Sequence, residues 1–130
     1  MLVTGDITLV VATSEPLGPV MQHRAVLFEY EGTKYILHQT FSGPELITWD
    51  KFIKKRTILF TRRYKLKKEL PVEDVLMWNE YQRFNLIFYN CENFCNDIID
   101  RYTTTRHTHM SQQILFWTVI VVLSIIKTSH

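Results

Sequence analysis

The chain has 130 residues, of which 46% are hydrophobic and 22% are charged, with four glycines, four prolines and two cysteines. This composition is that of one globular domain. It excludes a mainly disordered chain, a collagen-like repeat and a disulfide framework. The net charge of +2 is unevenly distributed, because residues 51–70 carry nine basic side chains and one acidic side chain. A small enzyme is compatible with all of these figures.

The first half of the chain is predicted to form antiparallel strands, because β-branched and aromatic residues cluster there between Gly- and Pro-containing breaks. Glu31-Gly32-Thr33 is expected to be the turn of a hairpin, and Ser42-Gly43-Pro44 is expected to end that hairpin. Residues 47–53 are expected to form a short helical or extended crossover. The predicted strands span residues 7–12, 24–30, 34–40 and 56–64.

Two helices are predicted in the second half. Pro71 and the acids behind it are typical of a helix N-terminus, and this helix should run to about Gln82. Asn90 is a favourable N-cap residue, and apolar residues recur at helical spacing from Cys91 to about Tyr102. We therefore expect an α+β fold, with a small antiparallel sheet followed by helices.

The C-terminal end carries an uncharged apolar run, residues 114–126, which reaches seventeen residues when extended back to Met110. Seventeen residues is the lower limit for a membrane-spanning helix. We expect residues 1–105 to form a catalytic domain and residues 110–127 to form a membrane anchor helix. A buried core helix or strand is the alternative, because Val and Ile dominate the run.

The location of the domain is predicted from the absence of secretory features. The N-terminal sequence has neither the basic start nor the apolar run of a signal peptide. The two cysteines lack a disulfide-scaffold pattern, and the chain has no Asn-x-Ser/Thr acceptor. We therefore expect a membrane protein with a C-terminal tail anchor and its catalytic domain in the cytosol.

Cys91 is the first candidate for chemistry. With Asn90 as N-cap, Cys91 is expected in the first helical turn, where free backbone N–H groups and the helix dipole stabilise a thiolate. The neighbouring charge of Glu92 opposes this effect. The alternative role is structural, because cysteine also serves as a small apolar residue in protein cores.

Two histidines in the predicted hairpin complete a candidate catalytic set. If Glu31-Gly32 is a two-residue loop, Tyr30 pairs with Thr33, and His23 and His38 become diagonal neighbours on one face. A three-residue loop would instead point the two rings to opposite faces. A cysteine hydrolase needs a thiolate, an imidazole that exchanges its proton, and a polar group that orients the imidazole.

These residues resemble a known family. Asn90-Cys91-Glu92-Asn93-Phe94 is similar to the Asn-Cys-Glu-His-Phe signature of the lecithin retinol acyltransferase (LRAT-like) family. Gly5-Asp6-Ile7 resembles the opening Gly-Asp strand of that family. His23 before an apolar strand, followed by Tyr35-Ile36-Leu37-His38, resembles its two-histidine hairpin. The resemblance covers roughly residues 5–102, and many members also carry a C-terminal hydrophobic anchor.

The resemblance implies a circularly permuted papain-like fold and the activity of a small phospholipase/acyltransferase. Carried over residue by residue, Cys91 is the nucleophile, His23 the general base and acid, and His38 the orienting third member. The implied chemistry is attack on an acyl ester or amide, a thioester intermediate, and transfer to water or to an acceptor amine or hydroxyl. Two positions depart from the family pattern, namely Asn93 in place of the motif histidine and Arg24 in place of an aromatic residue.

The basic block at residues 51–68 is expected to contact anionic lipid headgroups, at roughly 1 kcal/mol per basic residue near the surface. The alternative is the solvated side of a strand. No nucleic-acid partner is expected, because no nucleic-acid motif accompanies the interleaved aromatic residues. Cys91, Cys95, His107 and His109 are potential zinc ligands, but the His spacing is too tight for the common finger pattern. We expect no metal and no other cofactor.

Together these features predict a thiol-dependent acyl hydrolase or acyltransferase that acts on lipid esters through a Cys91 thioester. Membrane lipid would be both its substrate and the surface to which it binds. Two alternatives remain open. One is a non-enzymatic, membrane-anchored adaptor that kept the fold, and the other is a cysteine peptidase or amidase.

Replacing Ile120 by arginine tests the predicted anchor. A charge at the centre of a spanning helix costs roughly 2.5–3.5 kcal/mol on insertion scales, enough to expel so short a segment. Ile120→Arg should therefore move the protein from the membrane fraction to the soluble fraction, while Ile120→Leu should leave it in the membrane fraction. The anchor prediction is wrong if the unaltered protein is already soluble, or if deletion of residues 110–130 unfolds the domain by circular dichroism.

Overall fold

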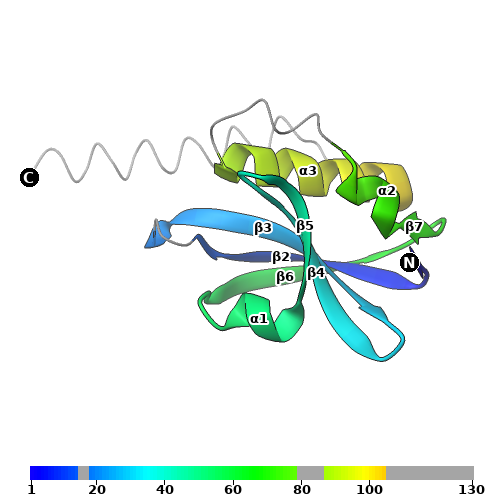
Figure 1. Ribbon diagram of the computed structural model, residues 1–130, viewed down its shortest axis with the longest axis horizontal. Helices are drawn as coiled ribbons and strands as arrows, with labels where there is room; N and C mark the ends of the chain where they lie inside the picture. The colour runs from blue at the N-terminus through cyan, green and yellow to red at the C-terminus, as the bar shows by residue number, and fades with distance from the viewer. Residues whose placement is uncertain (15–17, 79–86, 105–130) are drawn as a thin grey trace, which may run out of the picture.

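The computed structural model describes residues 1–14, 18–78 and 87–104. Five antiparallel strands form its central sheet, in the spatial order β5-β4-β3-β2-β6 (Figure 1). This sheet and the helices that follow confirm the predicted α+β class. The strands are β2 (Asp6–Ser14), β3 (Gly18–Tyr30), β4 (Thr33–Thr40), β5 (Gly43–Thr48) and β6 (Ile58–Lys65).

Helices lie on both faces of the central sheet (Figure 1). The longest, α3 (Ile87–Tyr102), crosses one face, and the short helix α1 (Trp49–Ile53) lies against the other. A two-stranded sheet and a third helix lie near the N-terminus. These are β1 (Leu2–Val3), β7 (Leu70–Pro71) and α2 (Val72–Leu76).

The central strand β2 is apolar on both sides, which explains its nearly continuous hydrophobic sequence. Ile7, Leu9 and Val11 belong to the core beneath α3. Val10 and Ala12 point the other way and pack with Phe52 of α1. Because alternate residues of a strand face opposite sides, the two helices bury both sets of side chains.

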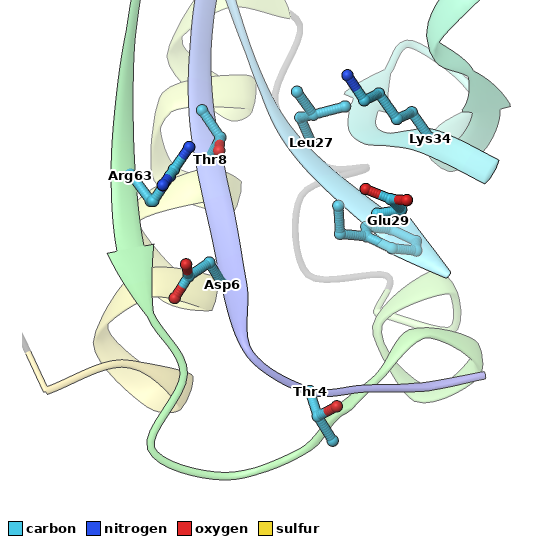
Figure 2. Close-up of a pocket in the computed structure, with 8 residues that line it drawn as sticks. Thr4, Asp6, Thr8, Leu27, Glu29, Lys34 and Arg63 are labelled. Atoms are coloured by element: carbon cyan, nitrogen blue, oxygen red, sulfur yellow. The ribbon is translucent and has the colours of Figure 1, made fainter. Parts of the chain in front are cut away.

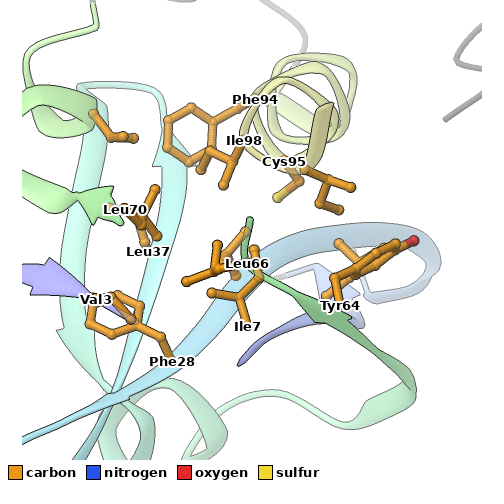
Figure 3. Close-up of a cluster of buried hydrophobic side chains, with 14 of the residues drawn as sticks. Val3, Ile7, Phe28, Leu37, Tyr64, Leu66, Leu70, Phe94, Cys95 and Ile98 are labelled. Atoms are coloured by element: carbon orange, nitrogen blue, oxygen red, sulfur yellow. The ribbon is translucent and has the colours of Figure 1, made fainter. Parts of the chain in front are cut away.

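The core beneath α3 is built from one stripe of that helix. Phe94, Cys95 and Ile98 are fully buried, and Figure 3 shows them above the sheet, on the side where Phe28 and Leu37 lie. These positions recur at intervals of three and four residues, as the sequence pattern required. Burial of this stripe holds α3 against β3 and β4, the strands that carry the candidate histidines.

The strand predicted at residues 34–40 ends at Thr40 as expected, but the sequence analysis did not predict the strand that follows, because the chain turns at Phe41-Ser42 and continues at once as β5. Proline lacks a backbone N–H and is normally excluded from the interior of a sheet. Strand β5 is an edge strand, however, so Pro44 sits where one side of the strand needs no hydrogen-bond partner. The other edge strand, β6, corresponds to the predicted strand at residues 56–64.

Both predicted helices differ from the structure in extent. Helix α2 ends at Leu76, because the N–H groups of Met77 and Trp78 donate to carbonyls only three residues back and close the last turn. The remainder of the predicted helix, residues 79–82, lies outside the described residues. Helix α3 already includes Ile87, so Asn90 lies within the helix and is not its N-cap.

The predicted anchor helix at residues 110–127 lies outside the described residues. In the ranges that the structure does describe, no helix has the length and apolar character needed to cross a membrane.

The turn between β3 and β4 confirms the two-residue loop. Tyr30 pairs with Thr33, and the ladder continues to Val26 opposite Leu37. Glu31 and Gly32 both have positive φ values, of 50° and 80°, as a type I′ turn requires. The turn therefore fixes the register of the strands that carry His23 and His38.

Substitutions in this turn should change stability in opposite directions. Gly32→Ala should lower the free energy of unfolding by about 1 kcal/mol, because a side chain is strained at positive φ even where nothing obstructs it. Glu31→Asn should raise the free energy of unfolding, because asparagine tolerates this conformation better than glutamate. Urea unfolding followed by circular dichroism measures both changes. Equal stability of all three proteins would contradict the assigned turn.

Candidate functional site

The candidate site lies where β3 and β4 separate. Their described ladder ends at Val26 and Leu37. Beyond this point β3 continues its pairing with β2, while β4 continues its pairing with β5 as far as Thr40 opposite Gly43. Figure 1 shows the two strands taking different directions here. The separation leaves room between the strands for side chains.

His23 and His38 meet across this separation. Nε2 of His23 lies 2.7 Å from Nδ1 of His38, a hydrogen-bond distance, and the rings meet edge to face with centroids 5.0 Å apart. Both side chains are buried. The Phe52 ring of α1 packs against both, at centroid distances of 6.1 Å from His23 and 5.8 Å from His38. The prediction that the two histidines share one face is confirmed.

Glu45 extends this pair, and it was missed by the sequence analysis. Its Oε1 lies 3.3 Å from Nε2 of His38, and the two residues are directly paired between β4 and β5. The signal was present in the sequence, since a two-residue loop at Phe41-Ser42 places residue 45 opposite residue 38. It was overlooked because Ser42-Gly43-Pro44 was interpreted as a break after the hairpin and not as the start of a further strand.

The two hydrogen bonds define which nitrogen carries each proton. An ionised carboxylate only accepts, so His38 donates through Nε2 to Glu45. A neutral His38 then accepts through Nδ1, and His23 donates to it through Nε2. This arrangement leaves Nδ1 of His23 unprotonated. His23 thus has the tautomer of a general base whose opposite nitrogen is held by an orienting group.

Burial keeps both imidazoles neutral. It lowers the pKa of His23 to about 2, and electrostatic interaction with the neighbouring His38 and with Arg56 lowers it further. Burial also lowers the pKa of His38, although the hydrogen bond and the charge of Glu45 act in the opposite direction. At neutral pH neither ring carries a charge. His23 in this closed state is therefore a base without a proton and not an imidazolium.

Cys91 contacts the strand next to His23. The backbone N–H of Arg24 donates to Cys91 Sγ across 3.4 Å. The side chain of Cys91 is fully buried, and this burial raises the pKa of its thiol to about 12. The Arg24 N–H and guanidinium oppose the rise, while the Glu92 charge adds to it. Arg24 and Glu92 form an ion pair with 3.6 Å between Nη2 and Oε1.

The thiol and the imidazole approach β3 from different sides. Arg24 faces α3, where it meets Glu92, whereas the preceding residue, His23, faces α1 and Phe52. The structure thus joins His23, His38 and Glu45 in one hydrogen-bonded row. It places the Cys91 sulfur at the adjacent backbone amide of that strand.

The predicted position of Cys91 in the first helical turn was wrong. Helix α3 includes Ile87, so a full turn precedes Cys91, and the backbone N–H of Cys91 is no longer one of the four free donors at a helix start. The sulfur receives its hydrogen bond from a strand instead. Cys95, one turn further along α3, is also fully buried, and burial raises the pKa of its thiol well above its usual value.

An open hollow of about 420 Å³ lies apart from these residues (Figure 2). Its charged lining has both signs, with Asp6 and Glu29 facing the same space as Lys34 and Arg63. None of the three predicted catalytic residues lines it. A lining with charges of both signs does not by itself identify a ligand.

No metal site is found in the part of the chain that the structure describes. Within it, no group of three or more His, Cys, Asp and Glu side chains is arranged to hold a metal ion. His107 and His109, considered above as zinc ligands, lie outside the described residues.

Comparisons with family models, with curated proteins and with solved structures each find no match to this chain. The resemblance to the LRAT-like family therefore rests on the residues quoted above.

The lowered pKa of His23 predicts how stability depends on pH. The unfolded chain binds a proton near pH 6.5 and the folded chain only near pH 2, so folding loses stability as the pH falls below 6.5. The contribution of His23 is up to about 1.4 kcal/mol per pH unit. His23→Gln should therefore lose less stability than the unaltered protein between pH 6.5 and about pH 4.5. Urea unfolding at several pH values measures this, and parallel pH profiles would contradict the assignment.

Proposed function

We propose that this chain is a thiol-dependent acyl hydrolase or acyltransferase of LRAT-like type, acting on lipid esters. Cys91 is the nucleophile, His23 the general base and acid, and His38 the residue that orients His23. Glu45 is added as the group that orients His38. The proposal includes the permuted papain-like fold, in which the strands with both histidines precede the helix with the cysteine.

One observation carries this proposal, namely the hydrogen-bonded row from Glu45 through His38 to His23 beside the Cys91 sulfur. A lone buried histidine is commonly structural. Here the Glu45 carboxylate accepts a hydrogen bond from His38, and His38 accepts one from His23. His23 is thereby kept in the tautomer whose Nδ1 is unprotonated. The next residue along the strand, Arg24, donates its backbone N–H to the Cys91 sulfur.

The proposed reaction proceeds in two steps. The Cys91 thiol gives its proton to Nδ1 of His23, and the sulfur attacks the acyl carbonyl to form a tetrahedral oxyanion. Collapse of this intermediate breaks the ester C–O bond, and His23 returns the proton to the departing alcohol oxygen. Water, or an acceptor amine or hydroxyl, then gives a proton to His23 and attacks the thioester. The acyl group is transferred and the thiol is restored.

The described state is a resting state for this reaction. With the thiol pKa raised to about 12 and the His23 pKa lowered to about 2, both groups are neutral and shielded from solvent. Substrate must therefore open the site before the sulfur can attack. Contact with a polar substrate or with water would bring both pKa values back toward their usual range and make the proton transfer easier.

The same burial favours a second candidate function, a non-enzymatic, membrane-anchored adaptor. A fully buried thiol and two neutral, buried imidazoles are also what an inert core contains. In that case the His23–His38 bond serves only to satisfy two polar side chains. Under either function we propose that residues 110–127 anchor the chain to a membrane with the domain on the cytosolic side.

Acyl labelling of the two cysteines separates the candidates. The full chain is incubated with phosphatidylcholine that carries an isotope-labelled acyl chain, quenched in acid and examined by intact-mass and peptide mass spectrometry. We expect a thioester on Cys91 that neutral hydroxylamine removes. Cys91→Ala should lose the label, and His23→Gln should slow its appearance by roughly 10²–10⁴-fold.

Cys95→Ala is the matched control, because Cys95 is equally buried on the same helix but belongs to the core beneath α3. It should keep most of the labelling. Absence of any thioester on the unaltered chain would favour the adaptor. A label on Cys95 in place of Cys91 would overturn the assignment of the nucleophile.

A further inference from the structure

The outer side of the sheet at β6 combines positive charge with exposed apolar side chains. Strand β6 lies at the edge of the sheet and pairs with β2, and no other described strand pairs with its outer edge (Figure 1). Five of its residues in succession, from Leu59 to Arg63, are exposed. We call this region, together with the end of α1, the basic edge. Its exposed charged and apolar residues are Ile53, Lys54, Lys55, Leu59, Phe60, Arg62, Arg63 and Lys65.

The charge of the basic edge is of one sign along the chain. Residues 51–68 contain nine basic side chains and no acidic one. Arg62 is held in place because its guanidinium lies over the Tyr64 ring, 5.3 Å from the centroid. Asp6, on the neighbouring strand, pairs with Lys65 at one end of β6. Toward the other end of β6, the neighbouring strand places Leu9 opposite Arg62 and Val11 opposite Phe60, with no acidic residue across from this part of β6.

The apolar residues lie at this same end. Leu59 and Phe60 are 44% and 49% exposed, and Ile53 is 38% exposed. Pairing of β6 with β2 shifts between Val11 and Ala12, so Leu59 falls in the irregularity of the ladder. Cations with interspersed large apolar side chains suit an anionic lipid surface, where the charges meet headgroups and the apolar groups enter the acyl region.

We propose that the basic edge docks the protein on an anionic membrane surface, with Leu59 and Phe60 inserted and Lys54, Lys55 and Arg62 among the headgroups. Charge alone would also suit a nucleic acid. Two of the three exposed apolar side chains, Ile53 and Leu59, are aliphatic, and aliphatic groups do not supply the stacking that single strands require. The observations therefore favour a lipid surface.

The basic edge is aligned with the candidate thiol. Phe60 pairs with Val11, and Val11 pairs with Arg24, whose N–H contacts the Cys91 sulfur. Two strand spacings of about 4.8 Å separate Phe60 from Arg24, so the inserted ring lies roughly 10 Å along the sheet from the site. If the proposed thiol chemistry holds, docking would bring the acyl esters of the membrane to that distance. The docking itself does not depend on that chemistry.

Vesicle binding of the full chain tests the proposal. Sedimentation compares vesicles of phosphatidylcholine alone with vesicles that contain about 30 mol% phosphatidylserine. Insertion of an apolar tail would contribute equally to binding of both kinds of vesicle. The ratio of the two affinities therefore isolates the part of the binding that depends on charge. We expect tighter binding to the anionic vesicles, and most of this excess should vanish at about 1 M salt, where the Debye length is about 3 Å.

Variants locate the binding surface. Changing Lys54, Lys55 and Arg62 together to glutamine should lower the excess affinity about a hundredfold, since each cation near the surface contributes about 1 kcal/mol. Binding to neutral vesicles should be unchanged. Phe60→Ala should weaken binding to anionic vesicles severalfold. Phe41→Ala is its control, because Phe41 is 69% exposed but lies in the turn between β4 and β5.

A matched pair of lysines tests position independently of charge. Lys65 on the basic edge lies opposite Asp6, and Lys34 on β4 lies opposite Glu29, so each exposed lysine has an acid across the strand. Lys65→Gln should lower the excess affinity by less than the loss of about fivefold expected for a cation with no acid across the strand, and Lys34→Gln should leave it unchanged.

Equal binding to both kinds of vesicle would overturn the proposal, as would equal losses in the two lysine variants. If the anionic vesicles show no preference but a single-stranded oligonucleotide binds and the triple variant loses it, the basic edge serves nucleic acid. Cys91→Ala should bind vesicles like the unaltered chain. A failure of the thiol chemistry and a failure of membrane docking are therefore distinguishable.

Discussion

The hydrogen bond between His23 and His38 depends on where β3 and β4 part. A type I′ turn at Glu31 and Gly32 sets the register, and the ladder stops at Val26 and Leu37, so the two imidazoles meet in the gap beyond it. A shift of one residue would send one ring to the other face and leave a buried polar group unpaired, at a cost of about 1–3 kcal/mol. The core beneath α3 and the apolar residues that pack with Phe52 of α1 reinforce this register. The same shift would move the buried side chains of each set to the other face of the sheet.

Burial determines the charge state of the site more strongly than any single neighbour does. It is the largest influence on the pKa of His23, His38 and Cys91, and it favours the neutral form of each. His23 is therefore a neutral imidazole with a single ring proton, and the Cys91 thiol keeps its proton. These are the states from which one proton transfer would begin.

Much of the sheet could be predicted because the side-chain period of a strand is fixed at two. The turn at Glu31-Gly32 alone led to the shared face of His23 and His38. Glu45 was missed because Gly43-Pro44 indicates a break and not the start of a strand, and proline is accepted there because β5 lies at the edge of the sheet. The start of α3 was misplaced because a short apolar run such as residues 86–89 fits a strand or a helix equally well. Tertiary packing, which local pattern does not encode, decides between them.

The hydrogen bond to the Cys91 sulfur comes from the main chain of residue 24 and not from its side chain. Nineteen of the twenty amino acids carry that N–H, so the contact is insensitive to what residue 24 is, with proline as the exception. The side chain there is consequently free to serve another purpose, which in this chain is the ion pair with Glu92. An arginine at this position, where the LRAT-like pattern has an aromatic residue, thus alters the surroundings of the thiol without removing the N–H that donates to it.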